Sequence, residues 1–246
     1  MVFQKEGSFM NRSISVASTI QNRPSVEEIL NAVTHGIGAA LSVAALVGML
    51  FHYANGGVWH LTSCLVYGLS LILLYLASTL YHSFTNIRLK GIFKFIDHAS
   101  IYVLIAGNYT PFALLPLHGS LGWTIFGVVW ALAVAGIIFQ LFCVKRFRIL
   151  GTVCYLGMGW FAVVMVQPLL TLLPVEAVYW LVAGGLLYTV GAVFYLVRSI
   201  PYNHVVWHLF VMAGSAAHFW TIFHYVLPVP EVMQQLAGLN LSLFLF

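Results

Sequence analysis

In this mostly apolar chain, two pairs of polar residues each have a spacing of four residues: Ser78 with His82, and His204 with His208. Residues at positions i and i+4 lie on one face of a helix, so both imidazoles of the second pair can reach the same ion. Three neutral imidazoles with water in the fourth position form a common zinc site. The spacing therefore predicts a metal site. The alternative is that each histidine is a core residue with a satisfied hydrogen bond.

A third group of polar residues precedes these pairs. Glu28, Asn31 and His35 are spaced i, i+3, i+7, which places them on one face of the first predicted helix. For Glu28 the competing interpretation is a capping box, in which Ser25 is the N-cap and Glu28 reaches back to it. For Asn31 and His35 the alternative is hydrogen bonding between helices.

Asp97, His218 and Ser215 each carry a chemical and a structural interpretation. Asp97 is predicted to open the third span, where its structural role would be the N-cap of that helix. His218 is excluded as a ligand because it lies about 15 Å along the helix from His208, at ~1.5 Å per residue. Ser215 and His218 are spaced like a nucleophile and its base, but no orienting acid accompanies them, so packing of small residues is favoured.

The elements that must position these residues follow from the composition. Of 246 residues, 61% are hydrophobic and 7% are charged, whereas a soluble domain averages about 25% charged residues. So few charges cannot cover a soluble surface, which excludes a cytosolic enzyme, a nucleic-acid-binding module and a secreted disulfide scaffold. The chain is predicted to be an all-α integral membrane protein.

Five stretches without Asp, Glu, Lys or Arg set the number of spans. A transmembrane helix needs about 20 apolar residues, so the first two stretches hold two spans each and the other three hold one each. These stretches cover 29–87, 98–144, 149–175, 177–197 and 199–230. The prediction is a bundle of seven transmembrane helices at 33–53, 58–82, 97–116, 121–143, 150–173, 177–197 and 203–226.

The basic residues predict the orientation. All ten Lys and Arg side chains fall in the N-terminal tail or in the three loops on the same side of the membrane. The positive-inside rule then places the N-terminus inside and the C-terminus outside. The same orientation brings the histidine pairs and Asp97 to one depth, near the cytoplasmic face. Residues 1–24 are predicted to be a mobile cytoplasmic tail, 25–226 the seven-helix membrane domain, and 227–246 a short C-terminal extension.

Four separated motifs resemble the hemolysin III family, the bacterial branch of the progestin and adipoQ receptor superfamily. The resemblance covers about 25–226, and the motifs surround Glu28, Asn31 and His35, then Ser78 and His82, then Asp97, and finally His204 and His208. It implies a multi-pass protein of the bacterial inner membrane. It also implies a zinc ion held by His82, His204 and His208, with Ser78 and Asp97 holding the water at the metal. Glu28, Asn31 and His35 would support the ligands.

Three functions remain open at this stage. The first is a zinc-dependent hydrolase of a lipid amide or ester involved in lipid homeostasis, with Asp97 as the base and membrane lipids as partners. This follows because zinc, three neutral histidines and one carboxylate leave one positive charge, which favours deprotonation of water. The second is a non-catalytic regulator in which zinc is structural. The third, a pore-forming cytolysin, is disfavoured because the seven apolar spans offer no amphipathic lining.

Overall fold

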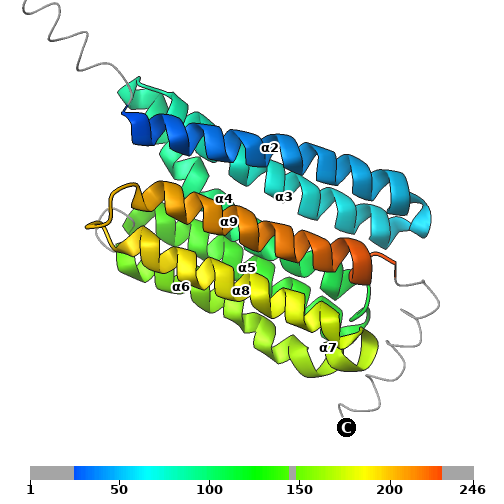
Figure 1. Ribbon diagram of the computed structural model, residues 1–246. Coiled ribbons are helices and arrows are strands. Elements are labelled where there is room, and N and C mark those ends of the chain that lie inside the picture. The colour runs from blue at the N-terminus through cyan, green and yellow to red at the C-terminus, as the bar shows by residue number, and fades with distance from the viewer. Residues whose placement is uncertain (1–24, 144–147, 229–246) are drawn as a thin grey trace, which may run out of the picture.

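The structure is a computed structural model that describes residues 25–143 and 148–228, and its chain is a bundle of long helices (Figure 1). Neighbouring segments of the chain pack side by side, and α9 packs against both α8 and α2, so that the first and last helices of the bundle meet. The described helices are α2 (Val26–Tyr53), α3 (Val58–Ser83), α4 (Ile87–Leu114), α5 (Ser120–Cys143), α6 (Arg148–Trp160), α7 (Val166–Leu172), α8 (Val175–Leu196) and α9 (Asn203–Thr221).

Within residues 25–143 and 148–228, six helical segments are long and apolar enough to cross a membrane: α2, α3, α5, α6 with α7, α8 and α9 with its extension. The seventh is α4, which carries charged residues in its first turns and packs against α3 and α5. Residues in its C-terminal half, including Tyr102 and Phe112, are almost fully buried by the neighbouring helices. The prediction of an all-α membrane bundle of seven helices is confirmed.

The start of α4 differs from the prediction. The helix begins at Ile87 rather than at 97, and its N-cap is Asn86, whose side-chain oxygen accepts from the backbone N–H groups of Arg88 and Leu89 at 3.0 and 3.3 Å. Asp97 therefore lies about three turns inside the helix, so the prediction that it opens this helix is wrong, and so is the structural alternative in which it is the N-cap. The physical reason is that charged residues end a hydrophobic run without ending a helix.

A glycine and a proline explain two other helix boundaries, between α2 and α3 and between α6 and α7. The turn between α2 and α3 ends at Gly57, which adopts φ 104°, a left-handed conformation that glycine takes without strain. The predicted span at 150–173 is divided into α6, a 3₁₀ segment at Phe161–Met165, and α7. Pro168 lacks the N–H that would bond to the carbonyl four residues earlier, which accounts for the break in the α-helical ladder.

The predicted tail at 1–24 and nearly all of the extension at 227–246 lie outside the described residues. The placement of the N-terminus inside and the C-terminus outside stays a prediction, because the fold alone does not define the two sides of the membrane. Within the described part, the end of α3 and the start of α9 lie at the same end of the bundle, and the candidate ligands are found there.

Candidate metal centre

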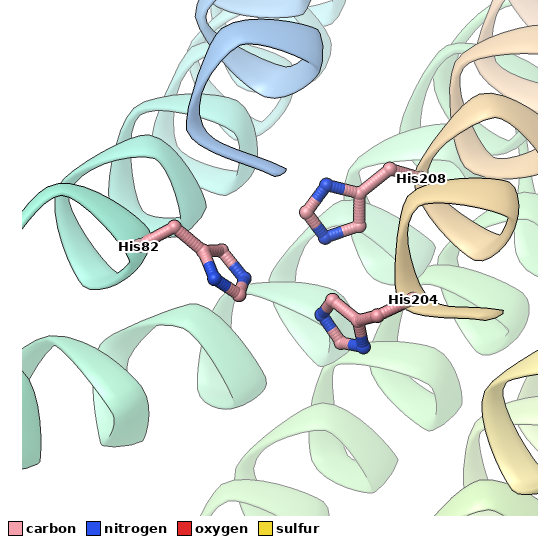
Figure 2. Close-up of side chains that lie close together, drawn as sticks. All are labelled: His82, His204 and His208. Carbon is pink, nitrogen blue, oxygen red and sulfur yellow. The ribbon is translucent and has the colours of Figure 1, made fainter. Parts of the chain in front are cut away.

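Three imidazole rings meet where α3 ends and α9 begins. His82 lies in the last turn of α3, while His204 and His208 occupy the first two turns of α9. One ring nitrogen from each histidine lies within 4.8 Å of the others, and Figure 2 shows the three rings directed toward a common point. His82 and His208 are buried and His204 is half-buried. The spacing that pairs His204 with His208 on one helix face therefore also brings them to His82 from a second helix.

The outer nitrogen of His82 is held by a carboxylate. His82 Nδ1 donates to Glu28 Oε2 at 2.8 Å, and Lys90 Nζ lies 3.1 Å from Glu28 Oε1. Because a carboxylate only accepts, Nδ1 carries the proton and Nε2 keeps its lone pair. His82 Nε2 is buried without a hydrogen-bond partner among the described residues. Such a nitrogen, with its partner nitrogen fixed by a carboxylate, is the arrangement typical of a metal-ligating histidine.

The protonated nitrogen of His208 is also fixed by an acceptor. Its Nδ1 lies 3.3 Å from the backbone carbonyl of Asn31, which can only accept, so Nδ1 donates and Nε2 has the free lone pair. The Thr34 hydroxyl, which itself donates to helix carbonyls, accepts from the same N–H at 3.3 Å. The imidazole of His35 stacks on that of His208, with 3.5 Å between ring centroids and 8° between planes. Helix α2 thus fixes the orientation of a ring on α9.

These contacts show how the face formed by Glu28, Asn31 and His35 is used. Ser25 is the N-cap of α2, since its hydroxyl accepts from the Glu28 N–H at 3.2 Å. The Glu28 carboxylate, however, points to His82 and Lys90 instead of completing a capping box. Asn31 acts through its backbone carbonyl, while its buried Oδ1 has no hydrogen-bond partner among the described residues.

Lys90 is the member of this group that sequence reasoning missed. It reaches Glu28 because α4 continues as a helix before Asp97 and carries Lys90 back toward the start of α2. The interval between Asn86 and Asp97 contains basic residues at 88, 90 and 94, which were interpreted only as topology signals. The signal that could have found the extended helix is Asn86, a residue type favoured at N-caps.

Ser78 and Asp97 line the cavity that also contacts His204 and His208. Ser78 lies one turn before His82 on α3 and is buried. Its hydroxyl faces the Asp97 carboxylate without the geometry of a direct hydrogen bond. Asp97 also lies 3.5 Å from His98 Nδ1, a nitrogen that donates to the carbonyl of Lys94. A carboxylate and a hydroxyl are thus available on the cavity side of the histidines.

The cavity has a volume of about 190 Å³ and a mostly apolar lining. From the histidines it extends between the helices toward His218, which is half-buried. Its wall includes Trp160, Val163 and Val182, whose side chains are also exposed on the outer surface of the bundle. The cavity therefore reaches the lipid-facing side between the α6–α7 segment and α8.

Ser215 and His218 do not form a nucleophile–base pair. The Ser215 hydroxyl is hydrogen-bonded to Tyr75 at 2.7 Å and to Tyr188 at 2.8 Å. The ring of His218 meets that of Tyr188, with 5.4 Å between centroids, and its Nε2 lies 3.1 Å from the carbonyl of Leu181. The sequence interpretation that this pair is not catalytic agrees with these contacts.

The donor set fits a metal ion. Three neutral nitrogens come from two helices, two of the rings have their other nitrogen occupied by an acceptor, and one candidate ligand atom is buried and unpaired among the described residues. Imidazole ligands suit zinc, copper, iron and nickel, so the geometry supports a transition-metal site without selecting one metal.

Comparison with known proteins places this architecture in a family. The sequence model described as "Haemolysin-III related" matches residues 25–219. The "Hemolysin-3 homolog" of Bacillus subtilis (strain 168) is 50% identical over 205 residues, which cover 83% of this chain and 96% of that protein. "Hemolysin-3" of Bacillus cereus is 48% identical over 203 residues, covering 82% and 93% respectively. The human "Monocyte to macrophage differentiation factor" is 30% identical over 211 residues, covering 83% and 86%.

Proposed function

Because this chain belongs to the hemolysin III family of membrane proteins, we propose that it is a zinc-dependent hydrolase of a lipid amide or ester that serves membrane lipid homeostasis. The observation that carries the proposal is one cavity that joins the imidazoles of His204 and His208, the Asp97 carboxylate and an apolar chamber. A structural metal would need the histidines, but it would need neither the carboxylate nor the chamber.

Zinc is the proposed metal because three neutral histidines with an open fourth position form one of its common catalytic sites. A zinc ion held by His82, His204 and His208 would supply Lewis-acid activation of water and of a carbonyl group. The Glu28 carboxylate pairs with His82 Nδ1 and Lys90 Nζ and does not line the cavity. Asp97 is therefore the carboxylate left to balance charge on the cavity side.

The residues of the chain can be given roles in the hydrolysis. Asp97 accepts a proton from the attacking water as the oxygen bonds to the carbonyl carbon of the substrate. The bond from that carbon to the amide nitrogen or ester oxygen then breaks, and Asp97 returns the proton to the leaving group. Ser78, which faces Asp97 and has an unpaired hydroxyl, orients the water. Water is the only co-reactant, and the products are a carboxylic acid and an amine or alcohol.

The substrate is proposed to be a membrane lipid. An apolar chamber inside a bundle suits an acyl chain, because burying the chain beside apolar side chains needs no polar partners. The wall formed in part by Trp160, Val163 and Val182 allows entry from the bilayer without passage through water. We propose that the protein lies in the bacterial inner membrane, as a member of its family. The metal site would then lie near the cytoplasmic face, because all ten basic residues fall on that side of the predicted topology.

A second candidate function has its own support. The contacts of Glu28 with His82 and Lys90, and of Asn31 with His208, connect α2, α3, α4 and α9 at one end of the bundle. A metal at the centre of these contacts would fasten the helices together. In this alternative the protein is a non-catalytic regulator of lipid state, and the zinc is structural.

Replacing Asp97 by Asn separates the two functions. Asp97 does not cap α4, so the change removes a base and a charge without weakening a helix end. For the hydrolase, release of fatty acid from fluorescent N-acyl and O-acyl lipids should fall by about 10²–10⁴-fold, the usual effect of losing a general base. Zinc content, measured on the purified protein, should be unchanged.

Full activity of Asp97→Asn on these lipids would contradict the role of Asp97 as the base. Absence of lipid hydrolysis by the zinc-loaded wild-type protein would contradict the hydrolase and favour the regulator. The control is Asn86→Ala, which removes the observed N-cap of α4 and should cost about 1 kcal/mol of stability while leaving the hydrolysis rate of the folded protein unchanged. Loss of rate in this control would show that distortion of α4, rather than loss of the base, explains the Asp97 result.

A further inference from the structure

A second polar cluster lies at the end of the cavity away from the histidine ligands. His218 and Asn108 line this end, on α9 and α4. His218 lies ten residues beyond His208, and Asn108 lies eleven beyond Asp97, which gives about 15 Å and about 16 Å along the two helices at ~1.5 Å per residue. Both helices lead away from the metal centre, so the two side chains reach a similar depth in the membrane.

A network of hydroxyl groups surrounds this end. Tyr75 donates to Ser215 at 2.7 Å, and the Ser215 and Tyr188 hydroxyls are 2.8 Å apart. The Asn108 amide lies beside the Tyr188 hydroxyl, yet Asn108 Oδ1 is buried without a hydrogen-bond partner among the described residues. The network therefore satisfies its own hydroxyl groups and leaves an acceptor unpaired.

His218 supplies a second acceptor. Its Nε2 donates to the backbone carbonyl of Leu181 at 3.1 Å, so Nδ1 carries the lone pair. This Nδ1 is also buried without a partner among the described residues. The ring is accommodated by Gly184, where a Cβ atom would come within 2.2 Å of His218 Cδ2. The sequence therefore makes room on α8 for a histidine whose free nitrogen accepts a hydrogen bond.

We propose that His218 and Asn108 form a second subsite, which recognises a hydroxyl group in the middle of the acyl chain of a lipid bound at the metal centre. An unpaired buried acceptor is costly, and a ligand hydroxyl that donates to it removes the cost. A cationic ligand group is not favoured, because Asp97 is the only carboxylate among the described residues that lines the cavity, and it lies at the other end. The substrate class is a hydroxylated fatty acyl amide or ester.

This inference rests on the proposed function, because that function identifies the molecule in the cavity as a lipid with an acyl chain. The subsite is tested by measuring lipid binding instead of hydrolysis, so the subsite and the proposed hydrolase can fail separately. The probes are ricinoleic acid and oleic acid, which differ by one hydroxyl near the middle of the chain. Affinity for the purified full-length protein in lipid nanodiscs is measured by displacement of a fluorescent fatty acid.

The wild-type protein is expected to bind ricinoleic acid about tenfold more tightly than oleic acid, the effect of one hydrogen bond to an otherwise unpaired acceptor. His218→Leu should remove the preference while leaving the affinity for oleic acid unchanged, which also shows that the variant is folded. His218→Gln, which keeps an acceptor, should retain part of the preference. If His218→Leu does not fold, Asn108→Leu tests the other acceptor in the same way.

Two results would overturn the subsite. Equal affinity of the wild-type protein for both acids would mean that the polar end does not recognise the hydroxyl, as expected if ordered water alone pairs with it. A preference that survives both His218→Leu and Asn108→Leu would place the recognition elsewhere. Absence of lipid hydrolysis combined with a His218-dependent preference would reject the proposed function and keep the subsite.

Discussion

The Glu28 carboxylate on α2 accepts a hydrogen bond from His82 Nδ1 on α3 at 2.8 Å. This contact fixes the tautomer of His82 and leaves the lone pair of Nε2, which has no hydrogen-bond partner among the described residues, available to a metal ion. Lys90, 3.1 Å from the second oxygen of Glu28, keeps the carboxylate charged where it is about one-third exposed. A residue at the start of the first helix therefore controls a candidate ligand at the end of the second.

Replacing Glu28 should weaken metal binding without removing a ligand. Glu28→Leu leaves His82 free to rotate and to take either tautomer, and loss of such an outer contact typically lowers metal affinity by 10–100-fold. The affinity is measured by competition with a chromogenic zinc chelator. Glu27→Gln removes the same charge one position away, in the same helical turn, and should leave the affinity within about twofold of wild type. Equal losses in both variants would indicate a general charge effect.

Metal content should depend on all three imidazoles that meet in Figure 2. Purified protein should contain about one zinc per chain, and His82→Ala, His204→Ala and His208→Ala should each remove most of it, because two imidazoles hold zinc poorly. Elemental analysis of the purified protein measures this directly. His218→Ala is the matched control on α9, since its ring lies about 15 Å from His208 along the helix. Equal zinc loss in that control would place the metal elsewhere.

Much of the fold follows from hydropathy because the bilayer imposes a minimum length on each apolar segment. The predicted span at 58–82 differs from the observed α3 by one residue, since a glycine turn precedes it. The start of α4 was misplaced by ten residues because hydropathy reports where the bilayer ends, and the helix continues beyond that point to Asn86. The interruption at Phe161–Met165 was missed although Pro168 was visible in the sequence.

The candidate site was predictable in so far as it depends on spacing within one helix. The interval from His204 to His208 is a local property, and the structure brings this pair to His82. Contacts between helices were not predictable in the same way. The pairing of Lys90 with Glu28 depends on the length of α4, and the use of the Asn31 carbonyl depends on how closely α2 approaches α9.

The orientation of the bundle remains a prediction with a direct test. All ten basic residues fall in the N-terminal tail or between the predicted spans on its side of the membrane, so the N-terminus should be cytoplasmic and the C-terminus outside. A reporter active only in the cytoplasm should be active when fused to the N-terminus and inactive at the C-terminus. A reporter active only outside the cytoplasm should give the opposite pattern at the C-terminus. Cytoplasmic activity at both ends would contradict a chain with seven crossings.

His35 should act through the shape of its ring and not through its nitrogens. The ring stacks on His208 at 3.5 Å and meets Tyr75 edge-on at 5.0 Å, while both nitrogens are buried without partners among the described residues. His35→Phe keeps a ring in the stack and removes two unpaired polar atoms, each of which costs about 1–3 kcal/mol. We expect this variant to retain its zinc and to melt at a higher temperature than wild type, whereas His35→Ala should lose both stability and metal affinity. If His35→Phe instead lost zinc as completely as His204→Ala, a nitrogen of His35 would belong to the metal site, and the assignment of three ligands would be wrong.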